Sequence, residues 1–68
     1  MSDHVYSITE IVGSSPTSIE DAINSALERA RQTLRNLEWF VVSETRGHLV
    51  DGALGHYQVT LKVGFRME

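Results

Sequence analysis

The sequence predicts an α+β fold of order β-α-β-β, in which a three-stranded antiparallel sheet wraps around one helix. Three observations predict it: β-branched residues at 4–12, an apolar repeat of helical period at 19–34, and two strand patterns at 38–50 and 54–67. A helix with one apolar stripe and a sheet with one apolar face bury these surfaces against each other. The 68 residues suffice for one domain, placed at residues 1–68.

The first strand is expected at residues 4–12, where Val5, Tyr6 and Ile8 supply the β-branched and aromatic side chains that strands favour. The segment Gly13-Ser14-Ser15-Pro16 has the composition of a turn. It is therefore expected to end the strand.

A helix is expected to begin at a cap formed by Thr17 or Ser18. Ser18 and Asp21 resemble a capping box with Asp in place of the usual Glu, and Asn36 is a candidate C-cap. The apolar stripe consists of Ile19, Ala22, Ile23, Ala26, Leu27, Ala30 and Leu34. The opposite side carries Asn24, Ser25, Glu28, Arg29, Gln32 and Arg35 and is expected to face solvent.

The second and third strands are expected to pair as a hairpin, because Asp51-Gly52 is typical of a two-residue turn. In the third strand, apolar side chains alternate with polar ones. The apolar set is Tyr57, Val59, Leu61, Val63, Phe65 and Met67. This face is expected to cover the helix, while the polar face, with Gln58 and Thr60, suits a ligand or another subunit.

A chain this short is expected to need support beyond its own core. Below roughly 70–80 residues a core rarely supplies more than about 3–5 kcal/mol. Cysteine is absent, and no Cys/His cluster suggests a structural zinc site. Since 41% of the residues are hydrophobic, the expected support is oligomerisation.

Charge and hydropathy exclude several classes of partner. The net charge of −3, from 9 acidic and 6 basic side chains, argues against nucleic acid. No apolar run approaches the roughly 20 residues of a membrane span, and the first residues lack the features of a signal peptide. A cytoplasmic protein is expected.

No catalytic signature unites the polar residues. His4, His48 and His56 are scattered along the chain without the helical spacing of metal ligands, and they are expected to be surface or interface histidines. The glycines do not form a phosphate-binding loop. We therefore expect neither an enzyme nor a metal site.

Trp39, the only tryptophan, has two interpretations. It stands where the helical pattern gives way to a strand. In a small domain a lone large ring is more often a packing anchor, but beside polar neighbours it also suits a platform for a flat ligand.

Short strings spread over nearly the whole chain resemble the dodecins, small flavin-binding proteins, and specifically the bacterial type. The strings are Glu10-Ile11-Val12-Gly13-Ser14-Ser15, Ala30-Arg31-Gln32-Thr33-Leu34-Arg35, Leu37-Glu38-Trp39-Phe40, Arg46-Gly47-His48, Tyr57-Gln58-Val59 and Lys62-Val63-Gly64-Phe65-Arg66. The resemblance implies a hollow homododecamer in which Trp39 stacks on the isoalloxazine ring, with a second Trp39 and a second flavin across a two-fold axis.

The resemblance also implies roles for polar residues. Gln58 matches a glutamine that hydrogen-bonds the polar edge of the flavin, and Arg46 matches an arginine near the ribityl phosphate. A guanidinium fits phosphate oxygens, which favours FMN over riboflavin or FAD. Strict alternation puts Arg46 and Trp39 on opposite strand faces, so a bulge near Gly47 or a second subunit is required.

Weaker candidates complete the expected sites. Arg66 shares the face of Gln58 and is a second phosphate candidate or an interface charge, and His48 is a further ligand-binding candidate. Arg29 and Gln32, on the exposed helix face, are candidate contacts for coenzyme A, which bacterial dodecins also hold.

The function implied is non-enzymatic binding, storage and photoprotection of FMN. Two alternatives stay open. One is a flavin-dependent oxidoreductase, and the other is a structural shell-forming module without flavin, in which Trp39 anchors an interface.

Overall fold

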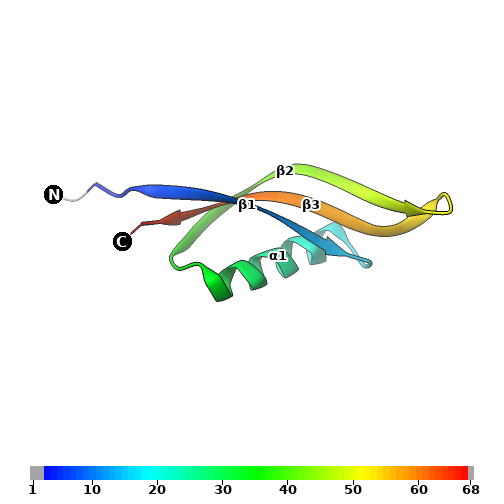
Figure 1. Ribbon diagram of the computed structural model, residues 1–68, viewed down its shortest axis with the longest axis horizontal. Coiled ribbons are helices and arrows are strands. Elements are labelled where there is room, and N and C mark those ends of the chain that lie inside the picture. Colours follow the sequence, from blue (N-terminus) through cyan, green and yellow to red (C-terminus); the bar gives the residue numbers. More distant parts are fainter. Residues whose placement is uncertain (1–2, 68) are drawn as a thin grey trace.

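The computed structural model describes residues 3–67, and residues 1, 2 and 68 of the predicted domain lie outside this range. The elements follow the predicted order: β1 (Tyr6–Ser15), α1 (Ile19–Thr33), β2 (Leu37–Val50) and β3 (Ala53–Arg66) (Figure 1). The strand order is β1-β3-β2, and both pairs are antiparallel. With α1 on one face of this sheet, the predicted fold class is confirmed.

β1 continues through Ser15, so the expectation that Gly13 begins a turn was wrong. Gly13 is buried within the strand, where a Cβ would overlap the carbonyl oxygen of Ala22 and lie 2.8 Å from the Cβ of Ala26. This glycine therefore serves close packing of α1 on β1 rather than a change of chain direction.

Ser18 caps α1 as predicted, because its Oγ accepts a hydrogen bond of 3.0 Å from the backbone N–H of Asp21. The Asp21 carboxylate does not complete a capping box. It accepts a 2.7 Å hydrogen bond from the hydroxyl of Ser15, which in turn accepts from the N–H groups of Thr17 and Ser18. The end of β1 and the start of α1 are thus joined by one buried hydroxyl.

The helix ends earlier than predicted. Its C-cap is Leu34, whose extended backbone still donates to the Ala30 carbonyl at 2.8 Å. Asn36 was the predicted cap, but it lies in the turn to β2 with a φ of 62°, a left-handed conformation that asparagine tolerates. The predicted hairpin turn is confirmed, since Asp51 and Gly52 have φ values of 53° and 79°, as a type I′ turn requires.

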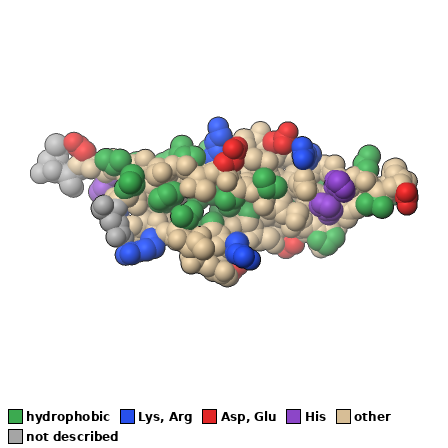
Figure 2. All heavy atoms as spheres, viewed as in Figure 1, with side chains coloured by type: hydrophobic (Ala, Val, Ile, Leu, Met, Phe, Trp, Pro, Cys, Tyr) green, Lys and Arg blue, Asp and Glu red, His purple; other side chains and the backbone are tan. Residues whose placement is uncertain are grey.

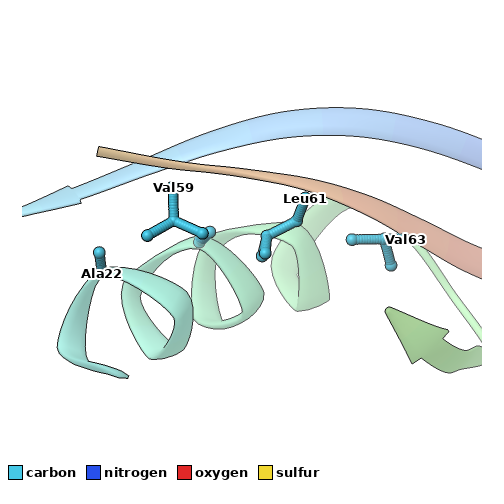
Figure 3. Packing of buried hydrophobic residues seen from close by; sticks show 5 residues of the cluster. Ala22, Val59, Leu61 and Val63 are labelled. Atoms are coloured by element: carbon cyan, nitrogen blue, oxygen red, sulfur yellow. The ribbon is translucent and has the colours of Figure 1, made fainter. Parts of the chain in front are cut away.

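The core lies between α1 and β3 (Figure 3). Val59, Leu61 and Val63 of β3 are at most 1% exposed, which confirms the middle of the predicted apolar face. They pack on the alanines of α1, whose small side chains let the helix approach the sheet closely. Met67, the last residue of the predicted set, is 55% exposed because it lies beyond the end of β3.

The protein is far from spherical, with extents of 57 × 20 × 14 Å. Its radius of gyration is 14.2 Å, whereas a compact domain of this length has about 11 Å. The β2–β3 hairpin extends beyond the helix as an arm (Figure 1), and hydrophobic side chains lie along the visible face (Figure 2). The exposed large hydrophobic residues include Val12, Phe40, Val41, Val42, Leu49, Val50 and Leu54. One protomer therefore leaves much apolar surface uncovered.

Candidate functional site: the open face of the sheet

The sheet face opposite α1, here called the open face, carries the predicted flavin-binding residues. The strand register places these residues on it: Tyr6, Ile8, Glu10 and Val12 of β1, Trp39, Val41, Glu44, Arg46 and His48 of β2, and His56, Gln58, Thr60, Lys62, Gly64 and Arg66 of β3. Because α1 covers the other face, this one is accessible in the protomer.

Trp39 reaches the open face through an irregularity in β2. Leu37 pairs with Phe65, but Trp39 already pairs with Gly64, so Glu38 is an extra residue in the ladder. The indole covers Gly64, and a Cβ there would overlap its Cε2 and Cζ2 atoms. Tyr6 packs edge-on against the indole with ring centroids 5.2 Å apart.

The surroundings of Trp39 fit a platform better than a core anchor. Its side chain is 40% exposed, and it is not part of the buried cluster. It also lines a cavity of about 400 Å³ between α1 and β2, together with Leu27 of the helix and Phe40 and Val63 of the sheet.

Arg46 lies on the same face as Trp39, because a second irregularity falls between Val42 and Glu44. Ser43 is the extra residue there, and its hydroxyl donates to the Thr60 carbonyl at 3.2 Å. The predicted bulge is therefore confirmed, but its predicted position was wrong. The bulge lies at Ser43, not near Gly47. The extra residue reverses the alternation between Trp39 and Arg46.

Gln58 stands at the centre of a polar chain on this face. Arg46 Nε donates to Gln58 Oε1 at 3.1 Å, and Gln58 Nε2 lies 3.4 Å from His56 Nε2. Arg46 also forms an exposed ion pair of 3.8 Å with Glu44, which contributes little by itself. Gln58 is thus held in place through its oxygen.

Within one protomer, Gln58 and Trp39 do not meet. Trp39 pairs with Gly64, and the distance along β3 from Gly64 to Gln58 is about 20 Å at 3.3 Å per residue. That is longer than the three fused rings of a flavin. Arg66, the second predicted phosphate candidate, lies closer to Trp39 along β3, two residues from Gly64, and pairs with Tyr6.

Arg29 and Gln32 lie elsewhere, on the exposed side of α1. Arg29 lines a groove of about 340 Å³ between α1 and β1, together with Thr9, Val12 and Thr33. These two residues belong to a surface separate from the open face.

A comparison with known families settles the relationship of this chain. The family model named Dodecin matches residues 5–68. The chain belongs to the dodecin family. The dodecin of Thermus thermophilus is 52% identical over 64 residues, which cover 94% of this chain and 93% of that protein. The calcium dodecin of Mycobacterium tuberculosis is 33% identical over 63 residues, with 93% and 89% coverage.

Solved dodecin structures have the same fold. The dodecin from Streptomyces davaonensis superimposes with a TM-score of 0.94 at 54% identity, and the match covers 98% of both chains. The open face of this dodecin therefore belongs to a backbone that its relatives share.

Three neighbours of the predicted residues were not predicted from the sequence: Tyr6 and Gly64 beside Trp39, and His56 beside Gln58. A signal existed for Gly64, because a glycine inside a strand often marks close approach of another group. No such signal existed for His56, whose proximity to Gln58 depends on side-chain rotamers.

Two further findings concern ions and membranes. Between residues 3 and 67, no group of three or more histidine, aspartate or glutamate side chains comes close enough to hold a metal ion. In the same part of the chain, no helix has the length and apolarity to cross a membrane.

Proposed function

We propose that this dodecin binds FMN by stacking its isoalloxazine ring on Trp39, and that it stores and buffers the flavin rather than catalysing a reaction with it. The observation that carries the proposal is the presentation of the indole on the open face: the extra residue Glu38 turns Trp39 away from the helix, and Gly64 beneath it leaves room for the ring. The side chain stays 40% exposed while its orientation is fixed.

Stacking supplies the main attraction. By analogy with bases on aromatic side chains, each ring contact contributes on the order of 1–3 kcal/mol. The contact between Tyr6 and Trp39 reduces the freedom of the indole before the ligand arrives, so less entropy is lost on binding.

The site requires more than one protomer. Since Gln58 and Trp39 of one chain are about 20 Å apart along β3, the glutamine that contacts the flavin edge comes from a neighbouring copy. The uncovered apolar residues of β2, such as Val42 at 40% exposure, supply surface for this association. The proposed assembly is the homododecamer that the family resemblance implies.

Arg46 is the proposed phosphate partner. Its Nε donates to Gln58 and one terminal nitrogen pairs with Glu44, and the guanidinium has further N–H groups that can donate to a phosphate. An arginine beside the glutamine favours FMN over riboflavin, and FAD would have to place its larger adenylate beyond the same arginine. Arg66, at the Trp39 end, is the second candidate.

Storage and photoprotection follow from the same geometry. A flavin held against an electron-rich indole loses its excited state rapidly, so light-driven side reactions are suppressed. We place the protein in the cytoplasm, with coenzyme A as a second ligand on the surface of Arg29 and Gln32.

The test is a titration of the intact, ligand-free oligomer with FMN, in which flavin fluorescence is measured at each addition. Quenching is expected for the wild type and for Val41→Ala, an exposed position on the same strand face. Trp39→Ala should bind at least tenfold more weakly, which corresponds to about 1.4 kcal/mol. Equal affinity in Trp39→Ala would overturn the stacking role.

The same preparation separates the alternatives. Sustained oxidation of a reduced nicotinamide in the presence of an acceptor would favour an oxidoreductase. An oligomer that stays colourless and gives no heat with FMN or coenzyme A would favour a structural shell.

A further inference from the structure

Two histidines face each other on the arm formed by the β2–β3 hairpin. The register pairs His48 of β2 directly with His56 of β3 on the open face. Their imidazoles are stacked, with centroids 4.9 Å apart and planes inclined by 21°. Histidine side chains gather toward the hairpin end of the molecule in Figure 2.

The backbone beside this pair is irregular. His48 pairs with His56, but the next pair is Leu49 with Leu54, so Gly55 is an extra residue in β3. A Cβ at Gly55 would lie 2.8 Å from Val50 Cγ2 and 3.2 Å from the His48 carbonyl oxygen. Bulges of this kind re-aim neighbouring side chains and occur often beside functional sites.

The geometry points to a two-histidine binding site for a divalent transition-metal ion. Two imidazole nitrogens bound at about 2.0–2.1 Å to a tetrahedral ion lie about 3.3 Å apart. The ring centroids lie 4.9 Å apart, and rotation about χ2, a torsion with a broad energy minimum, can bring one nitrogen of each ring toward this separation. The Gln58 amide approaches His56 Nε2 at 3.4 Å, and that turn releases this contact.

The donor set selects the metal. Imidazole suits Cu²⁺, Ni²⁺ and Zn²⁺, and the affinity of nitrogen sites is highest for Cu²⁺. Ca²⁺ takes six to eight oxygen ligands, so this site should discriminate against it. Within residues 3–67 of one protomer no third histidine or carboxylate joins the pair, so the remaining coordination positions hold water or a residue of another copy.

The positions of His48 and His56 along the chain do not indicate this site, because they lack the helical spacing of metal ligands. Across an antiparallel pair the relevant spacing is set by the hairpin register, which brings directly opposite Cβ atoms within about 4.5–5.5 Å. The site does not depend on flavin binding.

The experiment uses the intact, flavin-free oligomer after treatment with a chelator. Titration with Cu²⁺ followed by electron paramagnetic resonance should give one bound ion per chain, with hyperfine coupling to two imidazole nitrogens. Calorimetry with Zn²⁺ should show binding that Ca²⁺ does not displace. Coupling to a single nitrogen or none in the wild type would overturn the proposal without any substitution.

The variants locate the ligands. His48→Gln and His56→Gln should each lower Cu²⁺ affinity at least tenfold, while His4→Gln, the matched control at the third histidine, should stay within twofold of the wild type. Circular dichroism and oligomer mass verify that each variant folds. Unchanged affinity in both hairpin variants, or a loss that follows His4→Gln, would contradict the site.

Discussion

The indole of Trp39 covers Gly64 of the neighbouring strand so closely that any Cβ at that position would overlap the ring. Gly64 is buried although it lies on the open face, since the indole shields it. A glycine normally weakens a strand interior. Here it makes the contact that fixes the plane of the tryptophan, whose side chain remains 40% exposed.

Gly64→Ala should therefore displace the indole. The added methyl forces the ring out of its preferred rotamer, at a cost of typically 1–3 kcal/mol. We expect a changed Trp39 emission spectrum and FMN affinity lowered about tenfold, or about 1.4 kcal/mol, measured by fluorescence titration.

Thr60→Ala is the matched control, because Thr60 lies on the same face of β3 but pairs with Glu44, whereas Trp39 pairs with Gly64. Its emission spectrum and FMN affinity should equal those of the wild type. Wild-type affinity in Gly64→Ala would mean that the orientation of Trp39 on Gly64 is irrelevant to binding.

The parts of the fold that depend on local chemistry were predictable from the sequence. Asp51-Gly52 specified the turn, Ser18 the helix start, and the alternation in the third strand the buried face. Each of these features depends on residues close together in the chain. The predicted ends of β1 and α1 were less accurate. Gly13 has the composition of a turn but serves tertiary packing, and Asn36 has the composition of a C-cap but adopts a left-handed conformation in the turn to β2.

The arrangement of the site was only partly predictable. Residue types identified Trp39, Gln58 and Arg46, but the face of each depends on the extra residues Glu38 and Ser43. Neither position carries a glycine or another bulge signal in the sequence. Register is a property of paired strands, so strict alternation along one strand gave the wrong face for Arg46.

Ser15→Ala should destabilise the protein, although the substitution removes only one oxygen atom. The buried hydroxyl accepts from two backbone N–H groups and donates to Asp21, and removing it leaves these groups unsatisfied. Loss of such partners costs about 1–3 kcal/mol. Thermal denaturation should show a lowered midpoint, whereas Ser14→Ala, the exposed neighbour, should not. Equal midpoints for both variants would contradict this role.

Arg46→Ala should distinguish phosphate binding from positioning. If the guanidinium contacts the phosphate, FMN affinity falls by about tenfold or more while riboflavin affinity changes little, since charge-assisted hydrogen bonds contribute roughly 1.5–3 kcal/mol. Calorimetric titration of both flavins provides the measurement. Equal losses for the two ligands would show instead that Arg46 acts through its 3.1 Å hydrogen bond to Gln58.

Val42→Asp should separate assembly from the flavin platform. Val42 is 40% exposed and pairs with Leu61, on the face opposite Trp39, so the substitution leaves the indole and its neighbours unchanged. A carboxylate in an apolar interface is unpaired and costs several kcal/mol. We expect a smaller assembly by light scattering, together with loss of FMN quenching.

Ser25→Asp, on the exposed face of α1, adds the same charge outside that surface and should retain both the wild-type mass and the quenching. The decisive comparison in Val42→Asp is between the mass of the assembly and the affinity for FMN. A dissociated protomer that still binds FMN as tightly as the wild type would show that one chain contains a complete site, contrary to the separation of Trp39 and Gln58 along β3.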